Sequence, residues 1–122
     1  MALATVELGM DWESAVMIEL GELAAACRRF AESDCCDTEA FRTVVRQAEG
    51  LSRRIPAACG PVGSLVYWTL VVFKTRPADL TAHGAEAIAQ ALAAVDSPWM
   101  DGEAIAGLRA KLDEAGVRLK PF

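Results

Sequence analysis

The sequence predicts an all-α fold, a compact orthogonal or bundle-like arrangement of about five helices around a central hydrophobic helix. Alanine is its commonest residue, with 23 among 122, and alanine loses no side-chain entropy in a helix. Apolar residues recur at helical spacing in four segments, and a fifth segment is apolar on every side. Hydrophobic residues make up 53% of the chain, which excludes intrinsic disorder.

Two amphipathic helices are predicted in the first half of the chain. Asp11 is a suitable N-cap for the first, and Asp37 or Thr38 for the second. A polar loop over residues 32–37 separates them, and Pro56 ends the second. Their predicted core faces comprise Trp12, Val16, Leu20, Leu23, Cys27 and Phe30 in the first helix and Phe41, Val44, Val45, Ala48, Leu51 and Ile55 in the second.

Residues 62–73 (VGSLVYWTLVVF) are predicted to form the central helix, although their valine and aromatic content also suits a strand. A lone strand would have no partner elsewhere in the sequence, and an unpaired backbone cannot be buried. Pro61 suits the first turn of a helix. Lys74 and Arg76 favour the negative end of the helix dipole, and Pro77 ends the helix. We therefore expect the other four helices to surround this one.

Two further helices are predicted after this segment. Asp79 or Thr81 is the expected N-cap of the fourth, and Ser97 or Asp101 that of the fifth. Their predicted core faces comprise Leu80, Gly84, Ile88, Ala91, Leu92 and Val95 in the fourth helix and Ile105, Leu108, Leu112 and Ala115 in the fifth.

The whole chain, residues 1–122, is predicted to be a single helical domain, with residues 1–10 as a lead-in and residues 117–122 as a tail. Gly116 suits a left-handed stop to the last helix, after which Val117 folds back onto the final turn.

Charge is segregated along the chain. The formal net charge of −5 argues against general affinity for nucleic acid or anionic lipid. Residues 1–27 carry a net charge of −5, residues 28–76 carry +3, and residues 77–122 carry −3. Such segregation indicates neighbouring helices with complementary charged faces.

A cytoplasmic location is predicted. The first residues (MALATVELGMDWES) lack the basic lead and the long apolar run of an export signal, and four cysteines without such a signal are expected to be reduced thiols. The 19 uncharged residues from Ile55 to Phe73 resemble a membrane span in length, but two prolines and two glycines interrupt their first half. A buried helix is therefore the preferred interpretation, and no membrane partner is expected.

A row of arginines on the second helix is the first candidate binding site. Arg42, Arg46 and Arg53 fall within about 40° of one another around the helix axis. Three guanidinium groups in a row can bind phosphates, an acidic peptide or a nucleic-acid backbone. The alternative is that they form exposed ion pairs, which contribute only about 0–1 kcal/mol each. The acids expected for such pairs are Glu13, Glu19, Glu22 and Glu49.

Trp99 and Met100 are the second candidate binding site. They follow a Ser97-Pro98 corner between two helices, and tryptophan and methionine are enriched at protein interfaces. The alternative is that this corner closes the end of the bundle. Trp12 and Trp68 are expected in the core.

No cofactor, metal site or catalytic residue is predicted. Soft metal ligands are present, but there is no C-x-x-C pair, and adjacent cysteines chelate one ion poorly. Cys35-Cys36 in the polar loop is the remaining candidate, as a redox or soft-metal sensor. His83 is expected on a polar helix face beside Glu86 and Gln90, and no nucleophile motif accompanies it. The soft ligands considered are Cys27, Cys35, Cys36, Cys59 and His83.

The expected function is that of a non-enzymatic small helical protein that acts by protein–protein binding, as an accessory subunit, an adaptor, or an inhibitor or immunity-type factor. Two alternatives are a small nucleic-acid-associated subunit that uses the same arginines and a cysteine-based thiol or metal sensor. The sequence neither requires nor excludes a homo-oligomer.

Overall fold

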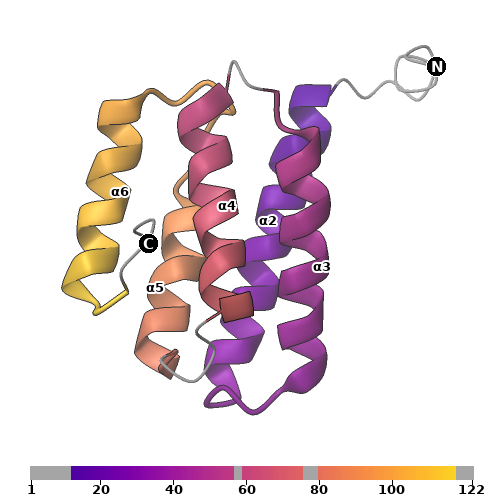
Figure 1. The fold of residues 1–122 in the computed structure, drawn as a ribbon, viewed down its shortest axis with the longest axis vertical. Helices are drawn as coiled ribbons and strands as arrows, with labels where there is room; N and C mark the ends of the chain where they lie inside the picture. The colour runs from indigo at the N-terminus through magenta and orange to yellow at the C-terminus, as the bar shows by residue number, and fades with distance from the viewer. Residues whose placement is uncertain (1–11, 57–58, 76–79, 118–122) are drawn as a thin grey trace.

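A computed structural model describes residues 12–56, 59–75 and 80–117. These residues form five α-helices that lie alongside one another (Figure 1). The all-α prediction is confirmed. The predicted lead-in, residues 1–10, lies outside the described residues, as does the predicted tail except for Val117. The helices are α2 (Trp12–Glu32), α3 (Thr38–Arg54), α4 (Gly60–Thr75), α5 (Ala82–Ala93) and α6 (Gly102–Glu114).

Capping residues fix the starts of three helices. Asp37 accepts a hydrogen bond from the backbone N–H of Ala40 at 3.0 Å, which confirms it as the N-cap of α3. Thr81 caps α5 and Asp101 caps α6, each through its side-chain oxygen. Among the alternatives, Asp79 lies outside the described residues, and the Ser97 hydroxyl instead accepts from the N–H of Trp99.

The last helix ends as predicted. Gly116 has φ 83°, in the left-handed region, and the N–H of Val117 donates to the carbonyl of Leu112 at 2.8 Å. The N–H of Gly116 donates to Asp113, so two carbonyls at the end of α6 are satisfied. Val117 is buried, and its side chain would lie 3.0 Å from a Cβ at Gly84. This turn therefore holds the end of α6 against the start of α5.

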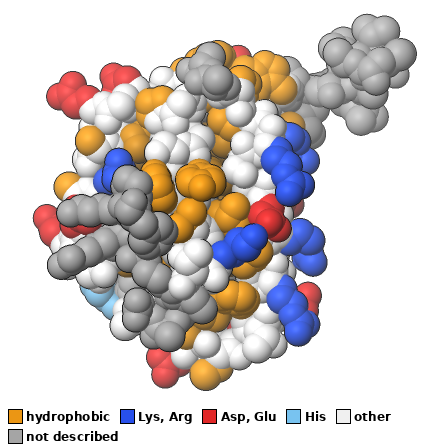
Figure 2. All heavy atoms as spheres, viewed as in Figure 1, with side chains coloured by type: hydrophobic (Ala, Val, Ile, Leu, Met, Phe, Trp, Pro, Cys, Tyr) orange, Lys and Arg blue, Asp and Glu red, His pale blue; other side chains and the backbone are white. Residues whose placement is uncertain are grey.

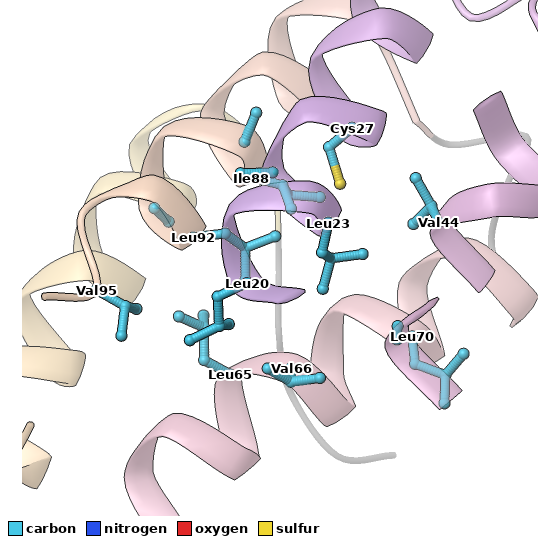
Figure 3. Packing of buried hydrophobic residues seen from close by; sticks show 14 of the residues in the cluster. Leu20, Leu23, Cys27, Val44, Leu65, Val66, Leu70, Ile88, Leu92 and Val95 are labelled. Atoms are coloured by element: carbon cyan, nitrogen blue, oxygen red, sulfur yellow. The ribbon is translucent and has the colours of Figure 1, made fainter. Parts of the chain in front are cut away.

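The core is centred on α2, which packs most extensively against α5 and next against α3. Leu20 and Leu23 are 0% exposed, and Figure 3 shows them beside Ile88 and Leu92 of α5. Near the C-terminal end of α2, three phenylalanine rings pack together and connect α2, α3 and α4. Their ring centroids lie 5.6–5.8 Å apart. These rings belong to Phe30, Phe41 and Phe73.

Helix α4 lies in the middle of the bundle in Figure 1 and contacts α3, α5 and α6. Seven of its residues are buried, including Thr69, whose hydroxyl donates to the carbonyl of Leu65. The expectation that α4 is surrounded on all sides is wrong at one position, because Tyr67 is 50% exposed. The helices that contact α4 lie at its sides and behind it in Figure 1, so no helix of the described chain covers its front. No helix within the described ranges combines the length and apolarity needed to cross a membrane.

Candidate functional site

The three predicted arginines lie on the outer face of α3. Arg42, Arg46 and Arg53 are all exposed, and eleven residues of helix place the ends of the row about 16 Å apart. Their backbone is rigid, because the opposite face of α3 buries Val44, Ala48 and other core residues. Figure 2 shows Lys and Arg side chains gathered along the right-hand edge of the molecule, over α3.

The acids expected to neutralise these arginines pair elsewhere. Glu49 lies on the same outer stripe of α3, but its carboxylate accepts from Lys74 of α4 at 3.2 Å. Glu19 of α2 pairs with Arg54, which is the last residue of α3. The alternative in which the row pairs with Glu49 or with Glu19 of α2 is therefore not what the structure shows, because Lys74 and Arg54 pair with these carboxylates.

The arginine row is left largely unpaired. Arg42 lies 4.0 Å from Glu39, at the outer limit of an ion pair, and both side chains are about three-quarters exposed. Arg46 and Arg53 form no ion pair with any residue that the structure describes. Ion pairing within the described ranges thus leaves two of the three guanidinium groups available to a partner.

Trp99 lies at the end of the bundle where the α5–α6 connection passes the start of α2. It is 52% exposed, and its ring meets that of Trp12 edge to face with centroids 5.5 Å apart. Met100 is partly buried and packs against the core. The prediction that Trp12 is a core residue is wrong. It stands in the first turn of α2 with 39% of its surface exposed, because the helix starts at the edge of the core.

The four cysteines are free thiols in different surroundings. Burial raises the pKa of Cys27 to about 12, which keeps this thiol protonated and unreactive. Burial, and then the charges of Asp34 and Cys36, raise the pKa of Cys35. Cys36 is exposed, but no cluster of three or more metal-ligating side chains occurs within the described ranges. The raised pKa of Cys35 leaves its thiol less ionised than a free cysteine at neutral pH.

A hollow of about 490 Å³ between α5 and α6 was not predicted from the sequence. His83 and Gln90, expected on a solvated face, border it from α5, while Lys111 and Glu114 border it from α6. Glu86 turns away from this hollow and pairs with Arg28 of α2 at 3.3 Å. The signal that could have revealed the hollow is the alanine spacing of α5, since Ala87, Ala91 and Ala94 lie on the face that borders it.

Comparison with known proteins gave no match to a family model, to a curated protein or to a solved structure.

Proposed function

We propose that this chain is a non-enzymatic binding protein whose α3 face binds an acidic segment of another protein. The observation that carries the proposal is the row of Arg42, Arg46 and Arg53, exposed on one stripe of a rigid helix and largely unpaired in an acidic molecule. An accessory subunit, an adaptor and an inhibitor all work in this way, by covering a charged surface of a partner.

The chemistry of the row suits carboxylates. A guanidinium group presents its N–H donors in a planar fork that binds a carboxylate through two parallel hydrogen bonds. The row spans about 16 Å, which corresponds to about five residues of extended peptide. A segment of that length with alternating acidic residues could place a carboxylate at each arginine.

A protein partner is favoured over nucleic acid because the basic surface is short and the rest of the molecule is acidic. The net charge is −5, and α2 has acidic residues in its first half. A polyanion longer than the row would extend past it and meet repulsion. A nucleic-acid-associated subunit remains the second candidate, and the experiment below separates the two.

The exposed rings of Trp12 and Trp99 offer an apolar contact at one end of the bundle, and aromatic residues of this kind often dominate binding energy at interfaces. We assign Trp99 to the binding surface. Its neighbour Met100 is partly buried, and its side chain packs against the core. The proposed compartment is the cytoplasm, where the free thiols stay reduced.

The test measures binding of a fluorescent glutamate-rich peptide by anisotropy at low and at physiological salt. The variant Arg46→Glu/Arg53→Glu should lose binding by at least about tenfold, because two attractive contacts become repulsive. The matched control is Ala25→Glu/Arg29→Glu/Ala106→Glu, which lowers the net charge by the same amount at exposed positions on α2 and α6. This control should retain most of the binding.

Equal losses in the α3 variant and in the control would show that the peptide responds to net charge alone, and the assignment to α3 would be wrong. A single-stranded oligonucleotide serves as the competing ligand. If it binds more tightly than the peptide, with a steep decline as salt rises, the nucleic-acid alternative replaces the protein-binding proposal.

A further inference from the structure

The hollow between α5 and α6 has the dimensions and the chemistry of a small-molecule site, and it is separate from the α3 row. Its volume of about 490 Å³ falls within the range of about 300–1,000 Å³ that such sites occupy. Ala87, Ala91 and Leu108 supply apolar surface. The hollow exists because α5 carries alanine where a longer side chain would fill the space.

The polar groups at the hollow carry opposite charges. Lys111 and Glu114 lie three residues apart on α6, so that both side chains project from one face of the helix. Neither forms an ion pair with a residue in the described part of the chain. Gln90 adds an amide that both donates and accepts hydrogen bonds.

A ligand with one charge would be attracted by one of these side chains and repelled by the other. A ligand that carries both an ammonium and a carboxylate would be attracted by both side chains. The side chains of neighbours three positions apart on a helix are separated by about 5–6 Å at Cβ, and two residues of extended peptide span about 7 Å. The two lengths are similar, so a dipeptide can place one terminus toward each of the two charged side chains.

We propose that the hollow binds a zwitterionic small molecule with apolar side chains, of the size of a hydrophobic dipeptide. Its ammonium would lie against Glu114, its carboxylate against Lys111 and its side chains against Ala91 and Leu108. The site is open to solvent on one side, so the affinity expected is modest, with a Kd on the order of 1 mM.

The test titrates leucyl-leucine into the isotope-labelled full chain and follows backbone amide shifts. Shifts should concentrate in residues 83–94 and 108–115, which include both walls of the hollow. N-acetyl-leucyl-leucine lacks the ammonium, and leucyl-leucinamide lacks the carboxylate. Each should bind about 3–5-fold more weakly, as expected for the loss of one solvent-exposed ion pair.

Substitutions locate the site. Ala91→Leu fills the hollow and should abolish the shifts, whereas Ala25→Leu places the same side chain on the exposed face of α2 and should leave them unchanged. If Ala91→Leu disturbs the fold, as its spectrum would show, Ala87→Leu serves instead. Lys111→Gln should remove the preference for a free carboxylate and keep that for a free ammonium, and Glu114→Gln should do the reverse.

The proposal is overturned if leucyl-leucine causes no shifts around the hollow at about 10 mM, well above the expected Kd. It is also overturned if Ala25→Leu weakens binding as much as Ala91→Leu, or if the two blocked dipeptides bind as well as the free one. The variant Arg46→Glu/Arg53→Glu should bind the dipeptide normally, so failure of the proposal for α3 leaves this one unaffected.

Discussion

Helix α5 packs against two neighbours in two different ways. Towards α2, its residues Ala85, Ile88 and Ala89 are 0% exposed, and Leu92 is 1% exposed. Towards α6, Ala87 and its neighbouring alanines border a hollow. The same alanine-rich helix thus makes a close-packed interface on one side and an open one on the other.

The difference between the two interfaces comes from the helix that packs against α5 on each side. Helix α2 has 21 residues and inserts Leu20 and Leu23 against α5, as Figure 3 shows. Helix α6 has 13 residues, and Ile105, Leu108 and Leu112 are its buried side chains. Alanine permits close approach, but the space it leaves is filled only where the neighbour supplies enough long side chains.

Truncation of one leucine in each interface should give the largest contrast. Leu20→Ala should lower the free energy of unfolding by about 3–5 kcal/mol, because it leaves a cavity in a region with no access to water. Leu108→Ala should lower it by about 2 kcal/mol, because this side chain already borders open space. Urea denaturation measures both values, and equal losses would contradict the distinction between the interfaces.

Enlargement of one alanine on each face is the converse experiment. Ala89→Leu should destabilise the protein by about 1–3 kcal/mol, since a fully buried alanine leaves no room for three more carbon atoms. Ala91→Leu should change the free energy of unfolding by less than about 1 kcal/mol, because the added atoms enter the hollow. Thermal and urea unfolding of the two variants check this. A larger loss for Ala91→Leu would mean that the hollow cannot accept a side chain.

The buried Cys27 thiol of α2 reports on the packing of the core through pH. Its pKa is about 12 in the folded protein and 9.0 when unperturbed. As pH rises above 9.0, the unfolded state ionises first, so the free energy of unfolding should fall until the folded thiol also ionises near 12. At pH 10 the loss from this thiol should be about 1 kcal/mol relative to pH 8.

The control for this measurement is Cys27→Ala. Its absolute stability will differ, but its free energy of unfolding should decline less steeply between pH 8 and about pH 10 than that of the wild type. Identical slopes would mean that Cys27 is accessible to solvent in the folded state.

The α3 row should give the smallest effect on stability, because it belongs to neither interface. Arg46→Gln/Arg53→Gln should change the free energy of unfolding by less than about 0.5 kcal/mol, since both side chains are exposed and unpaired with described residues. Urea denaturation at low salt tests this. A larger loss would show that the arginines serve the fold, and the binding proposal for α3 would lose its support.

Several features of the fold followed from local chemistry. The caps at Asp37 and Asp101 and the left-handed Gly116 depend on residues within a few positions of each helix end, so the sequence contains them fully. The core faces of α2 and α3 followed from helical spacing for the same reason. Trp12 was placed wrongly because the spacing does not reveal where the core ends along a helix.

The candidate sites also combine features that the sequence predicts with features that it does not. The position of Arg42, Arg46 and Arg53 on one face of α3 is a property of helix geometry, and it could be predicted. The ion pairs of the nearby acids could not be predicted. Glu49 pairs with Lys74 and Glu19 pairs with Arg54, and each pair joins two helices that are far apart in sequence. The alanine spacing of α5 indicates where a hollow could form beside His83, but whether it forms depends on the register and tilt of α6 against α5, which no local pattern encodes.

The sequence by itself determined that the chain folds into helices, where most of them begin or end, and which side of each is apolar, because these depend on interactions within one or two turns. Tertiary structure alone decided that α4 keeps Tyr67 in solvent, that two arginines form no ion pair with the described residues and that α5 and α6 leave a hollow. The physical reason is that such features arise from the shapes and charges of two helices meeting in space, and each helix carries only half of that information.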